Sequence, residues 1–176
     1  GNIRPGETIL VNGAGGSIGT FVVQLAKHFG ATVTAVDHGS KLEMLHSIGA
    51  DHTIDYTKED FANRSEKYDL IFDTVGKQSF SRCVRSLKPN GRYLLASPRP
   101  HTRFRGRWIN RLTTKKVIIE TVEPSKELLN ELAKLVSNGT IKVVIGQTYP
   151  LEKTAEAHRH AESGQKQGHV VITVSS

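Results

Sequence analysis

A glycine-rich segment near the start of the chain holds the residues best suited to chemistry. After the apolar run at residues 8–11, the sequence reads Asn12-Gly13-Ala14-Gly15-Gly16-Ser17-Ile18-Gly19 and continues with a helical apolar pattern to residue 29. Glycines let a backbone pass close to a phosphate, and a helix that begins there directs free N–H groups and its positive dipole end at the anion. The segment therefore predicts a strand, a turn and a helix that cradle the pyrophosphate of a dinucleotide.

The spacing is Ala14-x-Gly16-x-x-Gly19, with Ala14 where the first glycine usually stands. Asp37 closes the next apolar run about 20 residues on, where a carboxylate can accept hydrogen bonds from an adenosine ribose. We expect Ala14 and Gly15 to shape the turn and four N–H groups to face the pyrophosphate, those of Gly16, Ser17, Ile18 and Gly19. The alternative is a glycine-rich turn that only packs a helix tightly and binds nothing.

Short β-branched runs alternate with helical patterns along most of the chain. Strands are predicted at residues 8–11, 31–36, 52–54, 70–73, 92–96 and 117–121, and helices at 17–29, 41–48, 77–87 and 125–136. Such alternation predicts an α/β fold of the Rossmann type, a doubly wound parallel sheet with helices on both faces. Three further elements follow for one sheet to absorb: a strand at 141–145, a helix at 151–163 and a strand at 169–174.

The strand ends add candidate ligand contacts. Thr74, Val75 and Gly76 end the fourth predicted strand, and Ala96 and Ser97 end the fifth. Ligands of open α/β sheets lie at this carboxyl edge, although each segment could equally be a plain exit from its strand.

Composition predicts one ordinary domain of 176 residues with 37% apolar content. No run approaches the roughly 18 apolar residues that span a bilayer, and residues 1–6 lack a signal-peptide pattern, so we expect a cytoplasmic protein without a membrane partner. Cys83 is the single cysteine and is expected to be buried. His101, His158 and His160 lack metal-ligand spacing, so no metal site is predicted.

The net charge of +7 is concentrated in one stretch. Residues 98–116 contain no acidic residue and seven of the 24 basic ones: Arg99, Arg103, Arg105, Arg107, Arg111, Lys115 and Lys116. Such a run is typical of a solvated loop or a subunit contact, so no nucleic-acid partner is expected. Attraction to phosphorylated small molecules stays open.

Six motifs in collinear order resemble the medium-chain dehydrogenase/reductase superfamily, and within it the zinc-independent quinone oxidoreductase-like branch. They are VNGAGGSIG at 11–19, SIGADHTIDY at 47–56, YDLIFDTVG at 68–76, LKPNGRY at 87–93, YPLE at 149–152 and AEAHR at 155–159. The resemblance covers nearly the whole chain and implies an NAD(P)-binding Rossmann domain over residues 1–176.

In that family a β-rich substrate domain precedes the cofactor domain, and the nicotinamide lies between the two. The resemblance implies that residues 141–176 form a tail that returns to this substrate domain. The small-molecule substrate would then be held by a missing or separate domain, and no catalytic residue can be assigned here. Unpaired apolar strands in the tail also predict self-association into a homo-oligomer.

The cofactor prediction is NAD(P) with a slight preference for NADP. Asp37 alone favours NAD, because its charge would repel a 2′-phosphate. The resemblance places Lys41 and Tyr56, with His38 as a helper, at positions that hold that phosphate. His169 stands where the family commonly has a Lys or Arg that reaches toward the cofactor, and neutral histidine supplies less charge.

The leading functional hypothesis is the cofactor-binding domain of an NAD(P)H-dependent oxidoreductase that acts on a quinone, an enone or an alcohol dehydrogenase-type carbonyl substrate. One alternative is a truncated nucleotide-binding module without enzymatic activity. Another is an S-adenosylmethionine methyltransferase, since residues 87–92 also suit that fold. The methyltransferase is disfavoured by Asn12, where those enzymes prefer an acidic residue.

Overall fold

The main body of the chain is a six-stranded sheet whose neighbouring strands are all parallel. The computed structural model describes residues 1–96, 98, 100–119 and 125–174. The strands are β1 (Thr8–Asn12), β2 (Thr32–Asp37), β3 (His52–Asp55), β4 (Tyr68–Asp73), β5 (Leu87–Leu95) and β6 (Lys116–Ile118). Their order β3-β2-β1-β4-β5-β6 reverses direction between β1 and β4, the point where open α/β sheets bind ligands.

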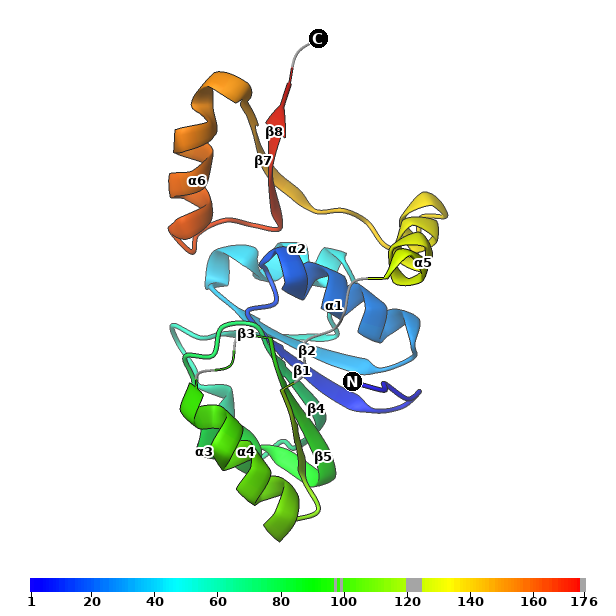
Figure 1. Cartoon of the computed structure of the whole chain (residues 1–176), viewed down its shortest axis with the longest axis vertical. Coiled ribbons are helices and arrows are strands. Elements are labelled where there is room, and N and C mark those ends of the chain that lie inside the picture. The colour runs from blue at the N-terminus through cyan, green and yellow to red at the C-terminus, as the bar shows by residue number, and fades with distance from the viewer. Residues whose placement is uncertain (97, 99, 120–124, 175–176) are drawn as a thin grey trace.

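Helices cover both faces of this sheet (Figure 1). Helices α1 (Ser17–His28) and α2 (Leu42–Ser47) lie on one face, while α3 (Phe80–Arg85) and α4 (Pro100–Leu112) lie on the other. Each face has its own apolar cluster, with Val23 and Leu45 in the first and Phe80 and Cys83 in the second. The predicted doubly wound Rossmann fold is confirmed.

Short 3-10 turns join several of these elements: η1 (Gly39–Lys41), η2 (Phe61–Asn63) and η3 (Leu151–Lys153). Cys83 is buried as expected, and burial raises the pKa of its thiol to about 11. It is therefore an inert part of the core rather than a reactive thiol.

The basic stretch is a helix for most of its length, so the loop, one of the two alternatives predicted for it, was wrong. The other alternative, a subunit contact, stays a prediction. Helix α4 packs against β6, where a Cβ on Gly106 would lie 3.0 Å from Val117 Cγ1. Asn110 bonds both backbone groups of Val117, donating from Nδ2 to the carbonyl over 3.1 Å and accepting from the N–H over 2.6 Å. Counting charges could not predict these contacts, because they depend on the uncharged residues Gly106 and Asn110.

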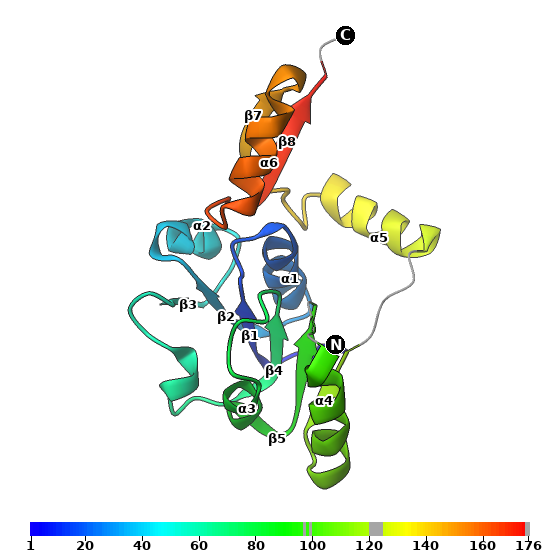
Figure 2. The ribbon, with the colours of Figure 1, turned by 60° about the vertical axis from the view of Figure 1, so that its left-hand side comes forward.

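The C-terminal elements form a unit of their own rather than joining the main sheet (Figure 2). They are β7 (Ile145–Pro150), α6 (Thr154–Glu162) and β8 (His169–Thr173), whereas the preceding helix α5 (Lys126–Ser137) lies apart from them. Strands β7 and β8 pair with each other in a separate two-stranded parallel sheet. One sheet was expected to absorb them, and that expectation was wrong.

Strand β7 begins at Ile145, where the predicted strand at 141–145 ends. The reason is a contact with α1: Gln24 accepts from the N–H of Lys142 over 2.7 Å and donates to its carbonyl over 2.9 Å. Ile141 is buried with 1% of its surface exposed. The backbone of Lys142 is therefore bonded to Gln24 of α1 instead of to a neighbouring strand, and strand pairing starts only at Ile145.

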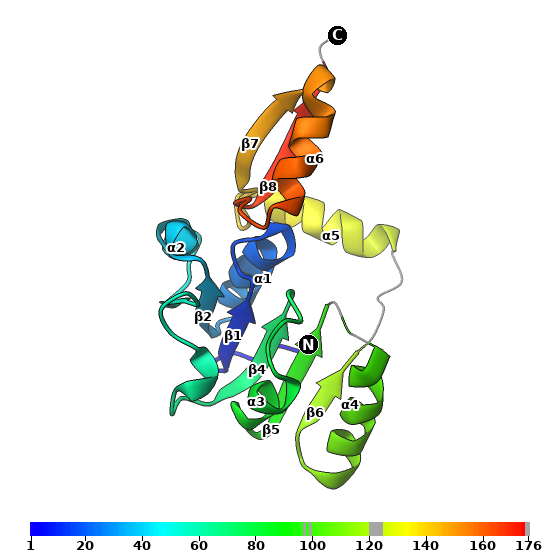
Figure 3. The same ribbon diagram turned by 90° about the vertical axis from the view of Figure 1, so that its left-hand side faces the viewer.

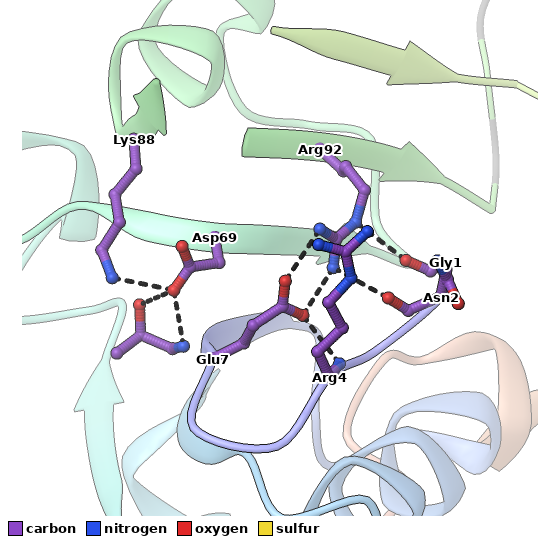
Figure 4. A network of polar contacts seen from close by, with 8 residues as sticks. Gly1, Asn2, Arg4, Glu7, Asp69, Lys88 and Arg92 are labelled. Carbon is purple, nitrogen blue, oxygen red and sulfur yellow. Dashed lines mark hydrogen bonds and ion pairs between the residues drawn. The ribbon is translucent and has the colours of Figure 1, made fainter. Parts of the chain in front are cut away.

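A polar network fixes the amino ends of the strands (Figure 4). Arg92 pairs with Glu7 at 2.7 Å, and Lys88 pairs with Asp69 at 2.8 Å. The hydrogen bond from Arg92 lowers the pKa of Glu7. Burial opposes the shift at Asp69, yet the bonds from Lys88 and Thr8 lower the pKa of that carboxyl as well. These ion pairs lie at the edge of the sheet opposite the glycine turn, so we assign them a role in stabilising the fold and none in the candidate site.

Within the described residues no helix combines the length and apolar character needed to cross a lipid bilayer.

Candidate dinucleotide site

The glycine turn is anchored to the ends of two strands. The N–H groups of Gly13 and Ala14 donate to the Val36 carbonyl at 2.9 and 3.1 Å. Gly13 has a φ of 79°, and a Cβ there would lie 2.3 Å from Thr74 Oγ1. A Cβ on Gly19 would lie 2.3 Å from the Gly13 carbonyl oxygen. Both glycines are therefore required for close packing of the strand, turn and helix.

The start of α1 presents free backbone donors. The first helical bond runs from Thr20 N–H to the Gly16 carbonyl, and no side chain caps the helix. In the described part of the chain, the N–H groups of Ser17, Ile18 and Gly19 have no acceptor. A Cβ on Gly16 would meet only the Gly13 carbonyl, at 3.6 Å, so this side of the turn is open. The cradle fits an anion such as a pyrophosphate.

Asp37 and Lys41 form a buried ion pair beside the turn, with 6% and 5% of their surfaces exposed. Lys41 Nζ lies 3.1 Å from Asp37 Oδ1, which also accepts the N–H of His38 over 2.8 Å. Asp37 Oδ2 accepts the Gly15 N–H over 2.7 Å. From the sequence, these two charges were expected to have opposite effects on a 2′-phosphate. In the structure they neutralise each other, and Asp37 also holds the turn.

His38 and Tyr56 lie together at the ends of β2 and β3. Their ring centroids are 6.1 Å apart in an edge-to-face arrangement, and Tyr56 is 55% exposed. Unlike Asp37 and Lys41, these two side chains are open to solvent. Their predicted contact with the adenosine end of a cofactor stays a prediction.

The end of β4 is organised by Asp73, a residue that the sequence analysis missed. Its carboxylate has no exposed surface and accepts from Val75 N–H at 3.0 Å and Gly76 N–H at 2.9 Å. Asn12 Nδ2 donates to it over 3.0 Å, and the hydroxyl of Tyr93 donates over 2.8 Å. Burial raises the pKa of the Tyr93 phenol well above its ordinary value. The sequence signal that could have identified Asp73 is an acidic residue at the end of a buried strand.

Asp73 thereby fixes the predicted contacts Val75 and Gly76, and the hydroxyl of Thr74 donates to the Asn12 carbonyl over 3.0 Å. Ala96 follows β5 and is exposed. Ser97 lies outside the described residues.

The C-terminal unit reaches the same turn. Gly168 N–H donates to the Gly15 carbonyl over 2.8 Å, and Ser17 Oγ donates to the Gly168 carbonyl over 3.0 Å. Lys166 Nζ lies 2.8 Å from Ser17 Oγ, a contact that the sequence analysis missed. The sequence signal for this contact was that Lys166 lies only three positions before His169, where the family commonly has a basic residue.

His169 packs its ring edge-to-face on Phe21 at 5.3 Å. Its Nε2 is buried and has no hydrogen-bond partner among the described residues. Burial, and then the charge of Lys166, lower the pKa of this histidine, so it is neutral near pH 7. The residues that the structure describes contain no cluster of three or more histidine, cysteine or acidic side chains that could hold a metal ion.

The comparisons with known proteins agree with this geometry. The family model described as "Zinc-binding dehydrogenase" matches residues 48–172. A 2-methylene-furan-3-one reductase of Solanum lycopersicum is 36% identical over 95% of this chain, and the NADPH-dependent alkenal/one oxidoreductase of Arabidopsis thaliana is 34% identical over 95%. The chain spans 40% of the length of each.

Among solved structures, the quinone oxidoreductase from Coxiella burnetii superposes on 98% of the chain with a TM-score of 0.85 at 25% identity, and the match covers 54% of that protein. The methyltransferase alternative is removed by the family match. The family model matches residues 48–172, and the two plant relatives extend the similarity over 95% of the chain, the glycine turn included. The chain therefore belongs to the zinc-binding dehydrogenase family, of which it represents the cofactor-binding half.

Proposed function

We propose that this chain binds a nicotinamide dinucleotide as the cofactor-binding part of a reductase or dehydrogenase. The observation that carries the proposal is the start of α1, where the N–H groups of Ser17, Ile18 and Gly19 have no acceptor in the described residues and Gly16 leaves the approach open. These N–H groups would hold the pyrophosphate. The chemistry that such a cofactor supplies when bound is hydride transfer.

The substrate class we propose is a carbonyl compound with a conjugated double bond, or a quinone. The tomato relative is named a 2-methylene-furan-3-one reductase, the Arabidopsis relative an alkenal/one oxidoreductase and the Coxiella burnetii protein a quinone oxidoreductase, and these names support the proposal. We propose that the substrate is held by a second domain or subunit, because these relatives are more than twice as long as the matched region. The isolated chain should therefore show no measurable turnover.

We further propose that NADPH is preferred to NADH. The charge of Asp37 is offset by Lys41 at 3.1 Å, so a 2′-phosphate nearby meets a neutral pair rather than a lone carboxylate. The exposed His38 and Tyr56 offer a polar surface beside that pair. The Arabidopsis relative is itself named as NADPH-dependent.

Titration calorimetry of the folded chain with NADPH and with NADH tests both proposals. We expect weak binding of both, with NADPH favoured. Lys41→Ala would leave the Asp37 carboxylate unpaired to repel a 2′-phosphate, so it should reduce the NADPH/NADH affinity ratio by about fivefold, which corresponds to roughly 1 kcal/mol. Because both affinities are measured on the same variant, a general loss of stability would affect both and would leave the NADPH/NADH ratio unchanged. No binding of either nucleotide at millimolar concentration would refute the dinucleotide site, and an unchanged ratio would refute the role of Lys41.

A further inference from the structure

The loop between α6 and β8, residues 163–168, lies against the glycine turn and is called the closing loop below (Figure 3). Three of its residues contact the turn and its neighbourhood. Gly168 is bonded through both backbone groups, to Gly15 and Ser17. The Gly164 carbonyl accepts from Lys41 Nζ over 3.2 Å, and Lys166 contacts the Ser17 hydroxyl.

Lys166 brings a positive charge to the start of α1. Its Nζ donates a hydrogen bond to Ser17 Oγ over 2.8 Å, and the Ser17 hydroxyl in turn donates to the Gly168 carbonyl. The hydroxyl is therefore fixed as an acceptor for the ammonium group. The first turn of α1 contains no acidic residue, and Lys166 has no carboxylate within ion-pair distance in the described residues.

Lys166 and Lys41 differ in burial and in how their charges are balanced. Lys41 is buried and its charge is consumed by Asp37. Lys166 is only partly buried and its charge is left unbalanced beside three free N–H groups. An unpaired ammonium and the positive end of a helix dipole repel each other, so the arrangement is favourable only when an anion joins them.

We propose that Lys166 is a binding residue for the dinucleotide pyrophosphate, and that ligand binding clamps the closing loop onto the glycine turn. The proposal rests on the proposed function. Its consequence is a coupling between the ligand and the C-terminal unit, since the anion would bind the turn and the closing loop at once. Because both nicotinamide dinucleotides carry the same pyrophosphate, Lys166 contributes equally to NADPH and NADH.

The test compares Lys166→Gln, Lys166→Arg and a control, Lys153→Gln, by titration calorimetry with NADPH and NADH. Lys153 lies in the same unit, is 60% exposed and contacts Glu156 instead of the turn. Lys166→Gln should weaken both ligands by the same factor, roughly five- to tenfold, and should flatten the salt dependence of binding. Lys166→Arg should keep most of the affinity, and the control should match the unmodified chain.

Hydrogen exchange supplies the second readout. NADPH should slow backbone exchange in residues 163–174 of the unmodified chain, and this protection should disappear in Lys166→Gln at equal ligand saturation. If Lys166→Gln does not fold, Ser17→Ala removes the acceptor of the ammonium and should weaken both ligands two- to threefold.

The outcomes separate the two proposals. If the unmodified chain binds neither nucleotide, the proposed function fails. If it binds them and the affinity of Lys166→Gln, or of Ser17→Ala in its place, is unchanged, only the role of Lys166 is overturned. Loss of affinity for NADPH alone would also overturn it, because it would place Lys166 at the 2′-phosphate.

Discussion

The two parts of the chain are built from similar elements but are stabilised differently. The sheet region, residues 1–119, holds both apolar clusters, and Ile9, Leu10, Val11 and Ile71 have no exposed surface. In residues 125–174, which include α5 and the C-terminal unit and are called the tail from here on, helix α5 buries no residue, and Leu129 is 68% and Ile145 55% exposed. Alternating strands and helices therefore make a stable layer only when a second layer covers the apolar face.

The tail is nevertheless fastened at defined points. Gln24 fixes residue 142 to α1, and the closing loop bonds to the glycine turn. These polar contacts are few, whereas the sheet region is held by contiguous apolar packing. We therefore expect the sheet region to respond to mutations of its interior and the tail to respond to ligand, pH and partners.

The largest effect is expected at Gly19, inside the sheet region. Gly19→Val should abolish dinucleotide binding and lower the thermal midpoint, because its Cβ would lie within 2.5 Å of the carbonyl oxygens of Gly13 and Ala14. Gly16→Ala is the matched control. Its Cβ meets nothing closer than 3.6 Å, so stability should be kept while affinity falls, as the methyl group narrows the approach to the N–H groups.

Calorimetry and thermal unfolding of both variants check this prediction. Normal stability of Gly19→Val would show that the turn can relax away from the helix. Full affinity of Gly16→Ala would mean that the anion does not approach on the open side.

The second-largest effect is expected when equivalent substitutions in the two regions are compared for their loss of stability. Leu10→Ala removes a fully buried side chain and should destabilise the protein by about 3 kcal/mol. Leu129→Ala removes a leucine that is 68% exposed and should change stability by less than about 0.5 kcal/mol. Urea unfolding followed by circular dichroism measures both. A large loss of stability from Leu129→Ala would mean that α5 is covered in solution, and sedimentation of the unmodified chain would then show whether a second copy covers it.

The smallest effect is a pH dependence confined to the tail. The pKa of His169 is lowered in the folded state, so below the ordinary value of 6.5 the unfolded chain takes up a proton that the folded chain resists. Stability of the tail should therefore be complete above pH 6.5 and fall as the pH drops toward the lowered pKa.

Hydrogen exchange of residues 169–173 between pH 8 and pH 5.5, corrected for intrinsic exchange rates, measures this loss. His169→Gln should reduce the pH dependence, and His158→Gln, which alters an exposed histidine of the same unit, should leave it unchanged. Equal pH profiles for His169→Gln and the unmodified chain would contradict the assignment.

Local pattern was sufficient for the elements that lie in the sheet. The β-branched runs place β1, β2, β3 and β4 within two residues of their predicted ends, and Gly13 to Gly19 mark the start of α1. Strand β5 starts earlier than predicted, at Leu87, because that residue pairs with Tyr68 before the register shifts. The prediction placed Leu87 at the end of a helix, because the local pattern of residues does not show pairing with a strand that is distant in the sequence.

The order of strands and helices, the glycine turn and the family could be predicted without the structure, because they follow from periodicity and from residues that are adjacent in the chain. Only the tertiary structure decided which charges meet. Asp37 and Lys41 neutralise each other, Asp73 closes β4, and Lys166 reaches Ser17 across 149 positions. Only the tertiary structure also separated β7 and β8 from the main sheet. The physical reason is that ion pairs and sheet membership depend on distances between remote segments, which the local pattern of polar and apolar residues does not encode.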